Sequence, residues 1–403
     1  MRQLVWACGG HLTVPGRDYD ERVPLSRRSA PDALPNVIAL ARAGLGDVRV
    51  VDLSDSNPTR HGLTDLAVSQ VVARAAARPP AYDPDPRGPI RAREALAARF
   101  GGHPSEYWVT AGTSMAYGWL FALLADAGHA VAVPQPGYPL VEPLAHLADL
   151  NTVEYPAYYL HPHGWENDLD ALGRVLAERP ARAVVVVHPN NPTGACADAA
   201  LLDVCARTGV PVIVDEVFWP FAVEAPTPAP RLPGATSTLT FGLDGVSKLL
   251  AVPHLKLGWI RMSGPPAAVA EAAPVLDRIA DAYLPVSTPI ADALPDLLAL
   301  ADAQIARVRA RLATNVAFAR EFFAAPYRVR RVDAGWTVLV DVPRVFGTND
   351  LAVTLLERAH LSVQPGWLYD LETPGALALS LLPEPAAFAD GCRGLRDAIA
   401  ALT

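Results

Sequence analysis

The sequence lacks the features that mark several protein classes. Its four cysteines, Cys8, Cys196, Cys205 and Cys392, form no CxxC pair and no Cys/His spacing typical of a metal site. We therefore expect a reduced, cytoplasmic protein without a bound metal. No block of basic residues stands out and the net charge is −8, which argues against binding to nucleic acid or to a membrane surface by charge.

Long hydrophobic runs are also missing. Residues 107–125 carry no charge and approach the length of a membrane span, but two glycines and several hydroxyl side chains interrupt them, so a buried segment is predicted instead. The stretch from Met1 to Pro15 has neither a long apolar core nor a strongly basic start, and we expect no signal peptide. Only 19% of the residues are charged and 51% are apolar, a balance that favours a globular chain, long enough here for two domains.

An alternation of strand-like and helix-like segments predicts the fold class. Apolar, β-rich runs occur at Trp108–Thr110, Val131–Val133, Val184–Val187, Val210–Val214, Thr238–Phe241 and Gly258–Arg261. Helical patterns between them include Ser114–Ala125, Asp168–Glu178 and Asp198–Thr208. This order predicts an α/β protein with a largely parallel sheet covered on both faces, in which ligands bind beyond the carboxyl ends of the strands.

Three polar residues follow these predicted strands and suggest a cofactor. Asn191 lies in the turn His188-Pro-Asn-Asn-Pro-Thr-Gly194, Asp215 closes the run that ends at Val214, and Lys248 comes further on in Gly245-Val-Ser-Lys. Pyridoxal phosphate (PLP) needs such a set: a lysine that forms a Schiff base with its aldehyde, an acid that keeps the ring nitrogen protonated, and an asparagine that hydrogen-bonds the ring hydroxyl.

These motifs stand in the order and spacing of the class I/II aminotransferase family of fold-type I PLP enzymes, which the sequence resembles from about Ser54 to the C-terminus. The resemblance implies a large domain with a mostly parallel seven-stranded sheet covered by helices, plus a smaller α+β domain. It divides the chain into an N-terminal arm with the first part of the small domain (1–63), the large PLP-binding domain (64–294) and the C-terminal part of the small domain (295–403).

The resemblance also implies further cofactor contacts. Ser247 and Lys256 match phosphate-binding positions, although many members have arginine at the second, which can make a two-pronged contact that lysine cannot. Independently of the resemblance, residues 107–114 have the pattern of a strand, a turn and a helix start with Gly112, Thr113 and Ser114. Helix N-termini bind phosphate, although an ordinary capped helix has the same pattern. Tyr138 matches the residue that stacks on the ring. Tyr82 matches the tyrosine that reaches the phosphate of the partner subunit, so a homodimer with shared active sites is expected.

The sequence departs from the family pattern at two positions. Ala378 stands where the family has the arginine that pairs with the substrate carboxylate. Candidates for its replacement are Arg27, Arg28, Arg261 and the motif that holds Asn57 and Arg60, but each arginine could equally be a surface residue. Phe218 stands where the family commonly has a tyrosine that donates to the ring hydroxyl, which predicts a raised pKa of the Schiff base.

Three functions remain open at this point. The motif set favours a PLP-dependent aminotransferase of an amino acid or a similar small molecule, in which the freed Lys248 moves a proton and Asp215 keeps the ring protonated while a carbanion forms. The two departures favour the alternative of a PLP enzyme for elimination, replacement, carbon-carbon bond formation or oxidation. A PLP-fold transcription regulator would need a preceding DNA-binding domain, for which the first sixty or so residues are too few.

Overall fold

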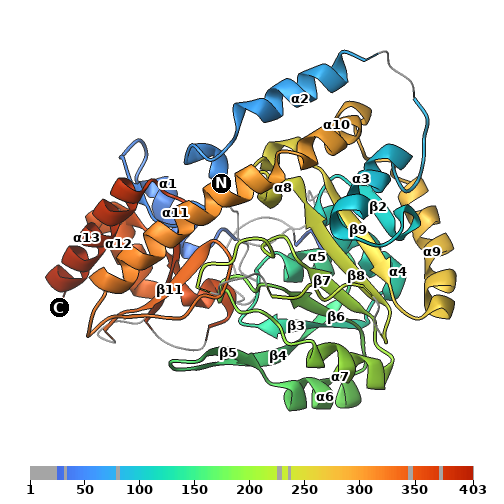
Figure 1. Cartoon of the computed structure of the whole chain (residues 1–403). Coiled ribbons are helices and arrows are strands. Elements are labelled where there is room, and N and C mark those ends of the chain that lie inside the picture. Colours follow the sequence, from blue (N-terminus) through green and yellow to red (C-terminus); the bar gives the residue numbers. More distant parts are fainter. Residues whose placement is uncertain are drawn as a thin grey trace.

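The computed structural model describes residues 25–30, 34–78, 82–224, 229–234, 237–343, 348–371 and 375–402. An eight-stranded sheet lies at the centre of the larger part (Figure 1). In spatial order its strands are β2 (Tyr107–Thr110), β9 (Gly258–Ser263), β8 (Thr240–Gly245), β7 (Val212–Asp215), β6 (Ala181–Val187), β3 (Ala130–Gln135), β4 (Asn151–Leu160) and β5 (Gly164–Asn167). The five strands from β8 to β4 run parallel, whereas the β2/β9, β9/β8 and β4/β5 pairs are antiparallel.

The mostly parallel α/β sheet is thus confirmed, and all six predicted strand segments overlap strands of this sheet. The expected seven strands are extended by an eighth, because the chain turns back between Leu160 and Gly164 and β5 pairs with the outer half of β4. Sequence reasoning did not predict β4 and β5. The outer half of β4 is partly exposed on both faces, and Pro156 precedes its short apolar run, so the segment lacks the buried, β-branched pattern of the central strands.

Helices bury both faces of this sheet. One face packs against α4 (Thr113–Leu124), α5 (Val141–Leu147) and α9 (Pro266–Asp281), and the other against α6 (Leu169–Glu178) and α7 (Ala200–Thr208). Strand β6 shows why its sequence is apolar throughout: Val185 and Val187 face the first group of helices, while Val184 and Val186 face the second. Over the β2/β9 end lie α2 (Leu66–Ala76), α3 (Ile90–Phe100), α8 (Val246–Leu249) and α10 (Thr288–Leu298).

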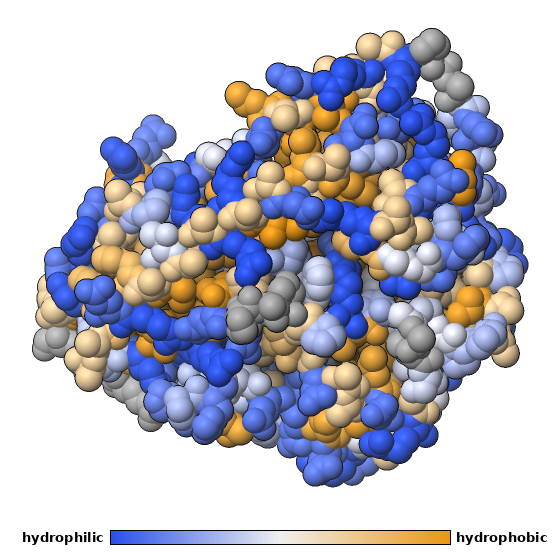
Figure 2. Space-filling view, in the orientation of Figure 1, coloured by the Kyte–Doolittle hydropathy of each residue, from blue (hydrophilic) through white to orange (hydrophobic). Residues whose placement is uncertain are grey.

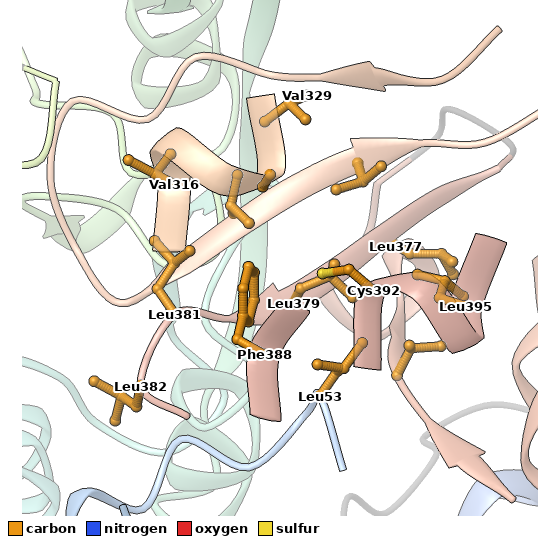
Figure 3. Packing of buried hydrophobic residues seen from close by; sticks show 14 of the residues in the cluster. Leu53, Val316, Val329, Leu377, Leu379, Leu381, Leu382, Phe388, Cys392 and Leu395 are labelled. Carbon is orange, nitrogen blue, oxygen red and sulfur yellow. The ribbon is translucent and has the colours of Figure 1, made fainter. Parts of the chain in front are cut away.

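A smaller α+β unit packs beside the large sheet. Its four-stranded antiparallel sheet has the order β10 (Arg328–Val329), β11 (Thr337–Asp341), β14 (Ala376–Ser380) and β13 (Gln364–Pro365). Its helices are α11 (Ala301–Phe322), α12 (Thr348–Ala359) and α13 (Pro385–Leu402). Figure 3 shows the core between them, where Phe388 and Leu395 of α13 meet Leu377 and Leu379 of β14.

Residues from the start of the described chain join this smaller unit. Strand β1 (Val51–Asp52) pairs in parallel with β12 (Leu361–Ser362), the side chain of Leu53 enters the core in Figure 3, and α1 (Val37–Gly44) packs on α12. Short 3-10 helices occur at η2 (Arg27–Ser29), η3 (Pro58–Arg60), η4 (Pro104–Glu106), η5 (Pro253–Leu255) and η6 (Gly366–Tyr369). The division of the chain at residues 63 and 295 stays a prediction.

The surface over α2 and α10 is partly apolar. Figure 2 shows hydrophobic side chains at the top of the molecule in this region, and Leu66, at the start of α2, is 81% exposed. Among the described residues, no helix has both the length and the apolar character needed to cross a membrane.

Candidate active site

The structure places Asn191, Asp215 and Lys248 beyond the carboxyl ends of three adjacent parallel strands. Asp215 is the last residue of β7, Asn191 lies in the turn after β6, and Lys248 lies in α8, which follows β8 directly. The backbone N–H of His188 donates to the carbonyl of Asp215 over 2.8 Å, which joins the first turn to the second strand end. Because the strands are parallel, their carboxyl ends meet at the same edge of the sheet.

Asp215 is a buried acid, 4% exposed. The Tyr117 hydroxyl donates to its Oδ2 over 3.1 Å, and the backbone N–H of Val217 donates to its Oδ1 over 3.2 Å. Burial raises the pKa of Asp215 to about 6, against the opposing effect of these two hydrogen bonds and of the positive charge on Lys248. The carboxylate therefore changes charge near neutral pH, where a cationic partner would keep it ionised.

Lys248 is partly buried beside aromatic rings. Its Nζ lies 5.3 Å from the ring centre of Trp336 and 5.7 Å from that of Phe218, and these two rings pack edge to face. Burial lowers the pKa of Lys248, Asp215 opposes this shift, and the positive charge of Lys256 adds to it. A lysine whose pKa is lowered supplies neutral amine, the form that attacks a carbonyl group.

Glycines bring three backbone segments together next to Lys248. A Cβ on Gly245, just before α8, would lie 2.8 Å from the carbonyl oxygen of Leu257, which accepts a hydrogen bond from the Val246 N–H. A Cβ on Gly258 would lie 3.0 Å from the Cα of Gly112, at the start of α4. Only glycine permits these approaches, so the sequence of these turns sets the spacing between the N-terminus of α4, α8 and the start of β9.

The candidate phosphate contacts lie on these three segments. Gly112, with a φ of +123°, is the N-cap residue of α4, and a Cβ there would meet open space. Thr113 is partly buried and Ser114 exposed in the first turn of α4. Ser247 is partly buried in α8, and Lys256 is exposed one residue before Leu257. The structure thus brings the predicted set around a helix N-terminus, where unpaired N–H groups attract anions.

Asn191 and Tyr138 lie on neighbouring loops. The amide of Asn190 donates to the carbonyl of Pro136 over 3.3 Å, which ties the turn of Asn191 to the loop of Tyr138. Asn191 Oδ1 is buried and has no hydrogen-bond partner within the described part of the chain. Burial raises the pKa of Tyr138 to about 12, and the negative charge of nearby Asp215 adds to this shift. Tyr138 therefore lies near Asp215, and Asn191 lies in the turn that is tied to the loop of Tyr138.

The remaining candidates have contacts elsewhere. Tyr82 is 78% exposed. Asn57 caps η3 by accepting from the Thr59 N–H, and Arg60 is exposed and pairs with Asp55 over 3.3 Å. Both arginines of η2, Arg27 and Arg28, are exposed, and Arg261 pairs with Glu106 over 3.1 Å. The structure brings none of these arginines into contact with Lys248 or Asp215.

Ala378 lies on the face of β14 that points away from the core of Figure 3. It is 1% exposed, stands opposite Leu339 in β11, and packs in a cluster with Tyr369 and Trp165. Its surroundings are therefore apolar, consistent with the loss of an arginine at this position.

Two site residues escaped the sequence analysis. Tyr117 lies four residues after Thr113 in α4, so the two side chains share one face of the helix. This spacing was the signal in the sequence that could have identified Tyr117. Trp336 lies in the loop before β11, 88 residues after Lys248 in the sequence, and no motif marks it. Among the described residues, no group of three or more histidine, cysteine, aspartate or glutamate side chains could hold a metal ion.

Comparisons with known proteins agree with this geometry. The family model for aminotransferase class I and II matches residues 49–383. Tyrosine aminotransferase of Homo sapiens is 28% identical over 276 residues, which cover 62% of this chain and 59% of the relative. Nicotianamine aminotransferase A of Hordeum vulgare is 31% identical over 206 residues, which cover 48% of this chain and 43% of the relative. The chain thus spans about half the length of these curated relatives.

A solved structure shows the same fold over nearly the whole chain. Alanine aminotransferase from Pyrococcus furiosus superposes with a TM-score of 0.82 at 20% sequence identity, covering 93% of this chain and 100% of that one. At this identity the likeness establishes the fold alone.

Proposed function

The chain belongs to the aminotransferase class I and II family, and on this premise we propose that it is a PLP-dependent aminotransferase of an amino acid or a similar small molecule. One observation carries the proposal: Asp215 and Lys248 follow the carboxyl ends of two adjacent parallel strands, where the charge of each acts on the pKa of the other. Groups perturbed by burial and by each other are typical of active sites.

The residues present fit PLP. The buried, unpartnered Oδ1 of Asn191 shows an amide with hydrogen-bonding capacity left for a ligand, and the glycine-spaced N-terminus of α4 offers a phosphate cradle. Lys248 would hold the aldehyde covalently, Asp215 the ring nitrogen, Asn191 the ring hydroxyl and Tyr138 the ring face. The phosphate would lie among Gly112, Thr113, Ser114, Ser247 and Lys256. When bound, PLP supplies a ring that withdraws electrons from the carbon bearing the amino group.

The side chains around Lys248 suit it to move protons. Burial lowers the pKa of its amine, which favours the neutral form that can accept a proton from the substrate carbon and return it. Phe218 and Trp336 cover Nζ with apolar surface and limit the access of water to it. The Tyr117 hydroxyl orients the Asp215 carboxylate, which holds a proton at the ring nitrogen.

We extend the proposal to a homodimer in a reducing, cytoplasmic setting. Exposed Tyr82, with Leu66 of α2 and Ile90 of α3 nearby in sequence, supports a surface on which a second copy packs and receives the tyrosine at its phosphate site. Cys196, Cys205 and Cys392 are free thiols, which supports the reducing setting.

The proposal is tested with Lys248→Ala. We expect purified wild-type protein incubated with PLP to show the visible band of the lysine-bound cofactor, and the variant to lack both that band and turnover. The matched control is Lys256→Gln, which removes an ammonium group proposed to hold the phosphate but leaves the covalent link, so the band should persist at saturating PLP. A variant at 248 that kept the wild-type band would contradict the assignment.

Ala378 and Phe218 favour a second candidate, a PLP enzyme that does not transaminate. Around Ala378 lie Leu339, Tyr369 and Trp165, and Arg330, whose guanidinium lies 5.3 Å from the Trp165 ring centre, already pairs with Asp341 over 2.8 Å. The two candidates differ in stoichiometry. An aminotransferase treated with an amino donor alone loses the visible band and recovers it only when a keto acid is added. An enzyme of the second kind turns over and regains the band without an acceptor.

A further inference from the structure

Two further acids lie next to Asp215 and Lys248 and share one arginine. Glu216 directly follows Asp215, and Asp244 precedes Lys248 by four residues; they are 1% and 2% exposed. Nη1 of Arg231 donates to Oε2 of Glu216 over 2.8 Å, and its Nη2 donates to Oδ2 of Asp244 over 2.9 Å. The guanidinium therefore links the ends of β7 and β8, the two strands that carry the proposed catalytic pair.

Every oxygen of the two acids has a partner. The backbone N–H of Leu232 donates to Oε1 of Glu216 over 3.0 Å, and that of Gly245 donates to Oδ1 of Asp244 over 2.7 Å. The guanidinium carbon of Arg231 also lies 4.3 Å from the ring centre of Trp219 and 4.7 Å from that of Phe100. The guanidinium has little freedom to move, because both of its terminal nitrogens donate hydrogen bonds and two aromatic rings pack beside it.

The arginine compensates buried negative charge. Burial raises the pKa of Glu216 to about 7 and also raises the pKa of Asp244, and Arg231 opposes both shifts. Asp244 in turn raises the pKa of Asp215. Other titratable groups near this cluster include Tyr107 and His188 beside Arg231 and Arg99 beside Asp244. Lys248 acts on Asp215 from the opposite side, and Arg261 lines the same small cavity as Arg231. Breaking such a network by removing one partner leaves an uncompensated buried charge.

We propose that Arg231 is a positioning residue, which holds Asp215 and Lys248 at their mutual spacing by bridging Glu216 and Asp244. This inference rests on the proposed function, because the pair it positions is the pair proposed to bind PLP. Arg231 itself contacts the two acids and two rings and need not touch cofactor or substrate.

The test compares Arg231→Met with the triple variant Arg231→Met/Glu216→Gln/Asp244→Asn. The amide oxygens of the triple variant can still accept from the Leu232 and Gly245 N–H groups, but the cluster carries no charge. The affinity of each cofactor-free protein for PLP is measured by fluorescence titration from pH 6 to pH 8.5, with Arg231→Lys as the conservative variant.

We expect Arg231→Met to bind PLP at least about tenfold more weakly than wild type at pH 8.5, and the difference to shrink toward pH 6 as the unbridged acids take up protons. The triple variant should return to within about threefold of wild type at both pH values, and Arg231→Lys should lie between. Equal affinity of wild type and Arg231→Met would overturn the inference. So would a pH-independent loss that the triple variant does not relieve, because it would indicate a merely structural role.

A second readout separates this inference from the proposed function. If wild type bound no PLP, the proposed function would fail, yet urea unfolding should still show Arg231→Met losing stability relative to wild type as the pH rises. Arg231 opposes the raised pKa values of both acids, so without it these values rise further in the folded state, and the variant loses more stability than wild type as the pH rises through them. If Arg231→Met does not fold, Arg231→Lys must show the same pH-dependent loss of stability, with a smaller magnitude.

Discussion

The hydrogen bond from Tyr117 to Asp215 offers a quantitative test of the site. Tyr117→Phe removes one hydroxyl and leaves the ring that packs 5.8 Å from Phe121 in place. The lost bond spans 3.1 Å between fully buried groups, and burial keeps the pKa of the Tyr117 hydroxyl well above its usual range, so the hydroxyl remains a donor at every relevant pH. A hydrogen bond to a charged acceptor contributes roughly 1.5–3 kcal/mol. At 1.36 kcal/mol per pKa unit, its removal should raise the pKa of Asp215 by about 1–2 units.

The assay follows PLP affinity of the cofactor-free protein against pH. The pKa of Asp215 is about 6, and its ionised form is the one that pairs with the protonated ring nitrogen. Affinity should therefore fall as the pH drops through about 6 in wild type, and begin to fall about 1–2 units higher in Tyr117→Phe. The ionisations of PLP itself are common to both titrations and cancel in the comparison.

Tyr155→Phe is the matched control, because it also removes a buried hydroxyl, one that donates to the carbonyl of Val185 over 2.8 Å. This control should lose stability without moving the midpoint of the affinity curve. The reasoning is refuted if Tyr117→Phe and wild type share the same midpoint, or if both tyrosine variants move it equally.

Two further variants probe the departures from the family pattern. Phe218→Tyr places a hydroxyl on a ring 5.7 Å from Lys248 Nζ and should lower the pKa of its Schiff base with PLP, read from a spectrophotometric titration; an unchanged titration would count against the assigned role. Aminooxyacetate and O-methylhydroxylamine both discharge the visible band, but only aminooxyacetate carries a carboxylate that a guanidinium can bind. In Ala378→Arg, the rate with aminooxyacetate divided by the rate with O-methylhydroxylamine should rise by about tenfold or more. Wild type should show a ratio near unity, and a wild-type ratio already as high as that of the variant would reveal another carboxylate-binding group.

Much of the site could be predicted because its chemistry follows local sequence features. Asn191 lies in the turn after one apolar strand and Asp215 ends the next, and parallel strands bring such residues to one edge whatever the rest of the fold does. The run Val184–Val187 is apolar throughout because helices cover both faces of its strand, which made it recognisable. Ala378 could be identified as a departure because it falls inside a motif with a defined spacing.

Other features depended on contacts between segments far apart in the chain. Trp336 reaches Lys248 from the smaller unit, and Arg231 reaches Glu216 and Asp244 from a loop between their strands; neither pairing has a local signal. The arginines weighed as substitutes for Ala378 could be separated from the site only by the partners the structure gives them, as for Arg261 with Glu106.

By itself, then, the sequence determined the order of six strands of the large sheet and the identity of the residues that follow their carboxyl ends. These depend on hydrophobic periodicity and on short turns, which act within a few residues. Only the tertiary structure decided which buried groups form ion pairs, form hydrogen bonds or lie beside an aromatic ring. Those interactions fall off within a few ångströms, and the distance between two side chains remote in sequence is set by packing of the whole fold.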